Sequence, residues 1–242
     1  ADTLRLLAIR VEFKTDSVNT TTGNGRFDLS SPASPGIDSP PHNRNYFKAQ
    51  LTALANYFSV ASGARLALQT EVFPVDENAA FQLPQNMSYY SPGKNSPQAD
   101  QRLSELFRDA VQAADQSGGI DFSSFDSFII FHAGVGNDFS IDFDSTPNDV
   151  PSAFLTLEDL RATVGNNDPA FRGIAVQSGA FQIPDGMILP ETQSQEGVEI
   201  GLLGTSALMF GHQLGLPNLF NTENGLPGIG RWGLMDQGSG NF

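Results

Sequence analysis

Three short apolar runs, separated by two amphipathic stretches, most constrain what this chain can fold into. Residues 4–13 (LRLLAIRVEF), 64–75 (ARLALQTEVFPV) and 125–134 (FDSFIIFHAG) have the composition of strands, and the last has the strongest buried-strand pattern. Residues 43–63 and 98–117 have helical periodicity. The alternation of strands and helices predicts an α/β (α+β) fold, with helices packed on a mixed N-terminal sheet.

The two predicted helices carry their own end signals. Asn43 or Asn45 is suited to cap the first helix, and Gly63 to end it. The pair Gly118-Gly119 ends the second helix. The apolar side chains expected on one face are Phe47, Leu51, Leu54, Tyr57 and Phe58 in the first helix, and Leu103, Leu106, Ala110, Val111 and Ala114 in the second.

Long loops join these elements. Residues 14–41 are rich in Ser, Thr, Asn, Gly and Pro, which is typical of a surface loop, and residues 74–97 form a second one. Loops of this length are unusual unless they are functional or held by something. Residues 152–190 contain short strand candidates such as 172–181, and residues 197–215 predict one buried helix.

Composition excludes several classes of function. The 242-residue chain has a formal net charge of −14, which argues against nucleic acid and against an anionic membrane surface as partners. It has no cysteine, so any metal must be held by His, Asp, Glu or carbonyl oxygen. We expect no membrane span, because no apolar run is long enough. No signal peptide is visible, so Ala1 is either a processed start or an arbitrary boundary.

A single histidine lies near the end of the last predicted helix. In the zinc-protease motif H-E-x-x-H, two histidines one helical turn apart bind zinc, and the Glu is the general base. Aligned on His212, this chain has Leu208 in place of the first histidine and Met209 in place of the base, followed by Phe210 and Gly211. Leucine has no lone pair, and a thioether is a poor zinc ligand that cannot accept a proton.

The surrounding sequence nevertheless carries a family resemblance. Residues 210–239 (FGHQLGLPNLFNTENGLPGIGRWGLMDQGS) are similar to the immune inhibitor A family of secreted bacterial metallopeptidases, which shows an H-E-F-G-H-x-L-G-L-P-D-L-Y type run and a later W-x-L-M segment. Residues 40–63, VFPV at 72–75, MSYYSPG at 87–93 and FIIFHAGVGND at 128–138 resemble landmarks of that family in the same order. The resemblance covers most of the chain.

The resemblance implies a zincin-like metallopeptidase catalytic domain. It predicts a single domain over 1–242, with an N-terminal sheet region of about 1–196 and a region of the former zinc helix and methionine turn over 197–242.

Carried over position by position, the scaffold residues match the family and the chemical residues depart from it. His212 matches the second histidine ligand, and Asn218 falls where the family usually has Asp, the third ligand. Gly215 and Pro217 match the turn that ends the helix, and Met235 matches a methionine turn beneath the metal. Because a stable zinc site needs about three or four protein ligands, zinc is not expected here.

Three functions follow as hypotheses. The first is a secreted bacterial pseudopeptidase that is catalytically inactive and binds a protein, a peptide or a surface. The second is an active zinc endopeptidase with a non-standard metal site. The third is a structural domain of a larger exported protein. The sequence leaves the oligomeric state open.

The other histidines have plainer interpretations. We expect His132 to lie at the end of a buried strand with a nearby hydrogen bond, and His42 to be a turn residue. We expect His212 to be packed and hydrogen-bonded to backbone, while Leu208 and Met209 fill the former metal pocket. A three-histidine site is the alternative, and its spacing has no support. Glutamates that precede the helix are Glu191, Glu196 and Glu199.

Calcium is a candidate cofactor at two acidic loops. Asp142, Asp144 and Asp149 alternate with other oxygen-bearing residues, as calcium sites do, although Pro147 occupies the glycine position of an EF-hand loop. Glu223 marks the second candidate loop. The alternative for both is a solvated acidic loop or a plain turn.

Overall fold

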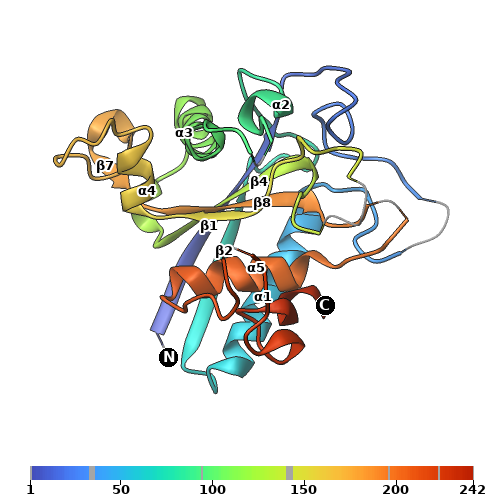
Figure 1. The fold of residues 1–242 in the computed structure, drawn as a ribbon. Helices are drawn as coiled ribbons and strands as arrows, with labels where there is room; N and C mark the ends of the chain where they lie inside the picture. Colours follow the sequence, from blue (N-terminus) through green and yellow to red (C-terminus); the bar gives the residue numbers. More distant parts are fainter. Residues whose placement is uncertain are drawn as a thin grey trace.

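The protein folds around one main sheet with helices on both faces (Figure 1). The computed structural model describes residues 2–32, 36–93, 95–139, 144–195, 197–222 and 224–241. Within them the main sheet has six strands in the order β2-β1-β4-β8-β5, with β3 also paired to β1. The strands are β1 (Asp2–Glu12), β2 (Leu66–Phe73), β3 (Phe81–Gln82), β4 (Ser127–Val135), β5 (Ala153–Leu155) and β8 (Gly186–Thr192).

Most of the strand pairs are parallel. β1 is parallel to β2, β3 and β4, and β4 is parallel to β8. In the main sheet, as far as the structure describes it, only β5, at one edge, runs antiparallel to its neighbour. The structure therefore confirms a mixed α/β fold and shows that its sheet is mostly parallel.

Two layers cover the sheet (Figure 1). One face carries α2, α3, α4 and the hairpin of β6 and β7, and the opposite face carries α1 and α5. The helices are α1 (Arg44–Ala61), α2 (Met87–Tyr90), α3 (Ala99–Ser117), α4 (Leu157–Ala162) and α5 (Leu202–Gln213). The remaining elements are β6 (Ile174–Val176), β7 (Phe181–Ile183) and the 3₁₀ turns η1 (Phe122–Ser124), η2 (Gln177–Gly179), η3 (Gly230–Trp232) and η4 (Gln237–Asn241).

The central strands are apolar on both sides because each side faces a core. In β1, Leu7 and Ile9 belong to the core under α3, whereas Leu6 and Ala8 belong to the core over α1 and α5. Parallel strands buried on both faces have near-continuous apolar sequences rather than alternating ones. This explains why residues 4–13 and 125–134 resemble buried strands so clearly.

The first helix begins and ends where its sequence indicates. Asn43 is the N-cap, and its side chain accepts a hydrogen bond from the Tyr46 amide. At the other end Gly63 adopts a φ of 63°, and the next amide, that of Ala64, donates to the carbonyl of Ser59 at 2.7 Å. A glycine in this left-handed conformation is the usual way to satisfy the last carbonyls of a helix.

Two elements differ from the sequence expectations. The helix expected over 197–215 is shorter, because α5 begins only after Gly201. The fully buried strand β8, which lies between β4 and β5, has no distinct signal in the sequence. Its Pro190 interrupts the pattern, since proline is rare in central strands. No helix within the described part of the chain is long and apolar enough to cross a membrane.

We predict that His132 makes the fold sensitive to acid. The ring is fully buried at the end of β4, with Nδ1 2.9 Å from the carbonyl oxygen of Ala133, and burial lowers its pKa to about 4. The unfolded chain binds this proton near pH 6.5, so the contribution of His132 to the free energy of unfolding should fall by about 3 kcal/mol as the pH drops from about 6.5 to about 4.

Urea unfolding across this pH range checks the prediction. The His132→Leu variant should lose this part of the slope, and His212→Leu, on a half-exposed residue, should keep it. Equal slopes in the native chain and His132→Leu would contradict a buried neutral histidine.

Candidate functional site

Helix α5, which carries the degenerate motif, is held from both ends and along one side. Its first amide, that of Leu202, donates to Oδ2 of Asp38 at 2.7 Å. Phe210 is fully buried, and its ring centroid lies 4.9 Å from that of Phe58 in α1. These contacts fix the helix against the sheet without any metal ligand.

The C-terminal end of α5 is a tight glycine turn. Gly215 has a φ of 84°, and its amide donates to the carbonyl of His212 at 2.9 Å. The amide of Leu216 donates to the carbonyl of Gly211 at 3.0 Å. This pair of bonds is a Schellman motif, which satisfies the orphan carbonyls of the last turn. Pro217 and Asn218 follow it and are exposed.

Met235 lies directly beside the same helix. Its side chain is 5% exposed, and a Cβ atom added at Gly211 would lie only 2.6 Å from its sulfur. The absence of a side chain at Gly211 therefore makes room for Met235. The helix, its glycine turn and the methionine form one packed unit.

The positions that would hold zinc do not fit that metal. Leu208 and Met209 are half-buried, and Met209 packs against the core shared with α1. His212 is half-buried, with Nδ1 3.2 Å from the carbonyl oxygen of Leu216. Within the described residues, no group of three or more His, Cys, Asp or Glu side chains is placed to hold a metal. One imidazole beside two apolar side chains cannot form a zinc site.

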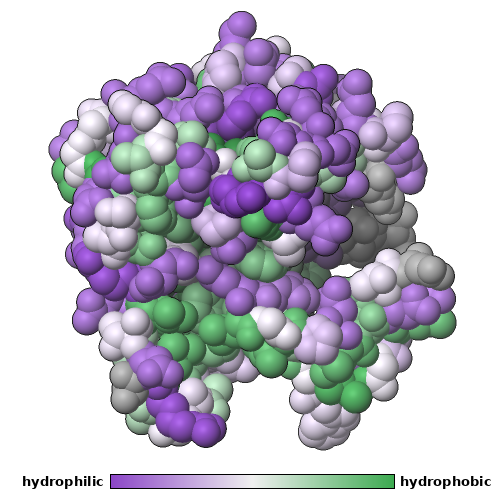
Figure 2. Space-filling view, turned by 90° about the vertical axis from the view of Figure 1, so that its left-hand side faces the viewer, coloured by the Kyte–Doolittle hydropathy of each residue, from purple (hydrophilic) through white to green (hydrophobic). Residues whose placement is uncertain are grey.

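The segment after α5 exposes apolar side chains. Figure 2 shows apolar residues gathered on the lower part of the molecule, where Figure 1 places α1, α5 and the C-terminal segment. Asp236 holds part of this segment, because its Oδ2 accepts hydrogen bonds from the amides of Gly228, Ile229 and Gly230 at 2.9, 2.7 and 2.7 Å. The exposed apolar residues are Leu214, Leu216, Leu219, Leu226, Ile229 and Trp232.

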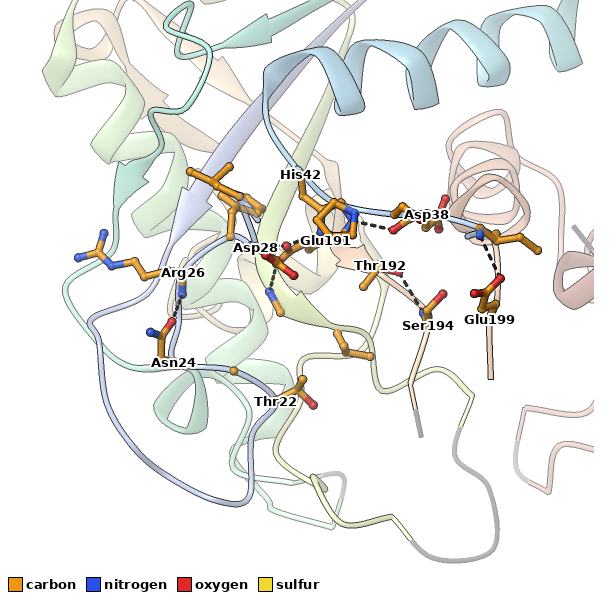
Figure 3. Close-up of a pocket in the computed structure, with 18 residues that line it drawn as sticks. Thr22, Asn24, Arg26, Asp28, Asp38, His42, Glu191, Thr192, Ser194 and Glu199 are labelled. Carbon is orange, nitrogen blue, oxygen red and sulfur yellow. Dashed lines mark hydrogen bonds and ion pairs between the residues drawn. The ribbon is translucent and has the colours of Figure 1, made fainter. Parts of the chain in front are cut away.

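A cavity of about 770 Å³ lies elsewhere, at the carboxyl ends of the parallel strands (Figure 3). Residues of the long loop after β1 and the ends of β4 and β8 line it. The connection from β1 to β2 runs over one face through α1, and the connection to β4 runs over the other through α3. Ligands of open α/β sheets bind where the connections diverge in this way.

A buried ion pair borders this cavity. Nδ1 of His42 lies 2.5 Å from Oε1 of Glu191, and each residue is only 3% exposed. Nε2 of His42 lies 2.7 Å from the carbonyl oxygen of Asp38. The expectation that His42 is a plain turn residue is therefore wrong. It lies in a loop, but its ring is buried because Glu191 at the end of β8 binds it.

The electrostatics favour a charged imidazole. Burial alone would lower the pKa of His42, but the hydrogen bond and the charge of Glu191 outweigh burial and raise the pKa above its usual value. Both ring nitrogens face oxygen atoms, which suits an imidazolium because both of its nitrogens donate. The same carboxylate also accepts the amides of Asp28 at 2.6 Å and of Gly134 at 2.7 Å.

Two of the candidate calcium ligands serve the loops directly. The buried Asp149 accepts the amide of Thr22 at 2.6 Å through one oxygen and the Thr22 hydroxyl at 2.7 Å through the other. Burial raises its pKa. Asp144 accepts the amide of Thr146 at 2.9 Å. The other two candidates, Asp142 and Glu223, lie outside the described residues.

The glutamates before α5 also have separate roles. Glu191 is in the ion pair with His42, and Oε2 of Glu199 accepts the amide of Ile37 at 3.0 Å. Glu196 lies outside the described residues. Sequence reasoning missed the pair of His42 and Glu191 because its members are 149 positions apart. Nothing in the local pattern around either residue indicates the other.

Comparison with known proteins adds no relative. No protein-family profile matches this chain, and no curated protein matches it. The resemblance to the immune inhibitor A family therefore depends on the sequence motifs alone.

The turn at Gly215 yields a stability prediction. Replacing Gly215 by Ala forces a side chain into the left-handed conformation, which should cost about 1–2 kcal/mol of unfolding free energy. Asn tolerates this conformation, so Gly215→Asn should cost less. Urea unfolding of the two variants measures the difference. Equal costs would show that the left-handed turn does not stabilise the end of α5.

Proposed function

We propose that this protein is a secreted bacterial metallopeptidase-like domain that has lost zinc catalysis and binds a protein or peptide partner. The observation that carries the proposal is the contrast within α5. The Schellman turn at Gly215 and the packing of Met235 keep the form expected of a zinc-protease helix. The ligand and base positions hold Leu208 and Met209, which supply neither function.

The missing metal ligands and the missing general base support the proposal that this domain is catalytically inactive. A stable zinc site uses about three or four protein ligands, and His212 is the one strong ligand left at the motif. A general base alone contributes roughly 10²–10⁴-fold to the rate of such a reaction, and no carboxylate stands beside His212 to act as one. Both losses fall at the same place, so neither compensates the other.

The edge of the sheet beside α5 supports binding of an extended segment. β5 is an edge strand, and no described strand pairs with its outer side. Phe154 of β5 packs against the same core as Met209 of α5, so the edge and the motif helix are neighbours. The unpaired side of an edge strand presents backbone donors and acceptors that an extended peptide can pair with. The net charge of −14 favours a basic partner.

A restored motif tests the loss of zinc. Leu208→His, Met209→Glu and Asn218→Asp together should give a chain that retains about one zinc after dialysis, because three ligands then surround the metal. The native chain should retain far less than one zinc and should not cleave casein. Stoichiometric zinc or zinc-dependent cleavage in the native chain would instead favour the active enzyme with a non-standard site.

A peptide assay tests the binding role. Fluorescence anisotropy should show binding of an extended peptide of alternating Lys and Thr, with affinity that weakens as salt increases. The same peptide with Glu in place of Lys is the control and should not bind. If neither peptide binds, the structural-domain hypothesis is favoured.

A further inference from the structure

We propose that His42 is a proton-controlled latch. In its charged form it holds residues 37–42 against the carboxyl end of β8, and loss of its proton loosens this segment from the sheet and from the first turn of α5. The inference is independent of the proposed function, because it needs no partner and concerns the carboxyl end of the sheet. The end of α5 that carries His212 lies instead near the start of β4, where Gln213 accepts a hydrogen bond from the Ser127 hydroxyl.

The first step is the set of bonds that the ring makes. Nδ1 lies 2.5 Å from Oε1 of Glu191, and Nε2 lies 2.7 Å from the carbonyl oxygen of Asp38. The carbonyl oxygen of Asp38 can only accept a hydrogen bond, and so can the carboxylate of Glu191 when it is ionised. The imidazolium therefore satisfies both sides of the site at once, linking the loop to β8 (Figure 3).

The second step is the effect of losing the proton. A neutral imidazole has one donor and one acceptor, so one of its nitrogens must then direct a lone pair at an oxygen. At the distances seen here, that leaves an acceptor against an acceptor inside a buried site. Glu191 also becomes a buried anion without its cation, which is costly unless the site opens to water. Moving residues 37–42 outward relieves both problems.

The third step is what moves with the latch. Oδ2 of Asp38 accepts the first amide of α5, that of Leu202, at 2.7 Å. The amide of Ile37 donates to Glu199 at 3.0 Å. Residues 37–40 and His42 also form one wall of the 770 Å³ cavity. Opening the latch therefore widens the cavity and uncaps α5 together.

The charges that face His42 set the pH range. Glu191 comes from β8, Asp28 and Asp38 from the loop, and Tyr46 from α1, with its ring centroid 4.5 Å from that of His42. The Tyr46 hydroxyl donates to the backbone carbonyl of Glu191 at 3.0 Å. Burial opposes the charged imidazole, but the carboxylates prevail and the pKa of His42 is raised. Burial raises the pKa of Asp38 as well, so that group gains its proton on the acid side.

The sign of the pH effect follows from linkage. The closed latch binds the proton more tightly than the open one, so the closed state is favoured fully below about pH 6.5. Between about pH 6.5 and the folded pKa of His42, the opening equilibrium should rise about tenfold per pH unit and then level off.

Hydrogen exchange combined with NMR tests the latch in the native chain. The three histidines give separate imidazole signals, so the folded pKa of His42 is measured directly. The amides of Ile37, His42 and Leu202, whose hydrogen bonds join residues 37–42 to their neighbours, report the latch. Their exchange, corrected for intrinsic rates, should rise about tenfold per pH unit and level off at that pKa. The amide of Ile130, in the buried centre of β4, should not follow.

A matched variant removes the proton without removing the hydrogen bond. His42→Asn places an amide donor near the position of Nδ1. In this variant the exchange of the reporter amides should not depend on pH beyond their intrinsic rates. His212→Asn is the control and should keep the native dependence. If His42→Asn does not fold, the native titration still decides the question.

Three outcomes would overturn the latch. His42 could titrate without any rise in exchange at the three reporter amides. The rise could persist in His42→Asn. The amide of Ile130 could follow the same curve, which would make the ion pair a contributor to global stability only.

Discussion

The arrangement of the loops at the carboxyl end of the sheet depends on the hydrogen bonds of one buried carboxylate, that of Glu191. It joins three segments, because it binds the ring of His42 and the amides of Asp28 and Gly134. A buried charge is tolerated only when its hydrogen-bonding capacity is filled, and removing one partner of such a pair typically costs about 3–5 kcal/mol. One side chain at the end of β8 therefore holds the long loop after β1 at both Asp28 and His42.

The same device recurs along the loops. Asp149 accepts hydrogen bonds from the amide and hydroxyl of Thr22, and Asp38 accepts one from the first amide of α5. Asp236 accepts hydrogen bonds from three successive amides, 228–230, in the segment that follows α5. By accepting hydrogen bonds from backbone amides, these carboxylates hold the loops against the rest of the fold. The acidic composition is thus partly structural, since several carboxylates are used to order the backbone rather than to attract ligands.

The parts of the fold that sequence could predict are those set by local physics. Periodicity and end signals are contained within a helix, so α1, with its cap at Asn43 and its turn at Gly63, could be predicted closely. β8 could not, because a short strand with Pro190 in it has meaning only beside β4. The pair of His42 and Glu191 depends on that missed strand, so the ion pair was missed with it.

Helix α5 is held in place by contacts that involve no metal ligand. What fixes α5 is its buried side, the turn at Gly215 and the contact between Gly211 and Met235, and none of these involves a metal ligand. Leu208 and Met209, at the positions that the resemblance assigns to the first ligand and the base, are half-buried, and Met209 packs against the core shared with α1.

Asp38 adds a further contact at the first turn of α5, where its Oδ2 accepts a hydrogen bond from the Leu202 amide. Asp38 in turn belongs to the segment that His42 holds. A chain of hydrogen bonds therefore runs from the ring of His42 through Asp38 to the first turn of α5.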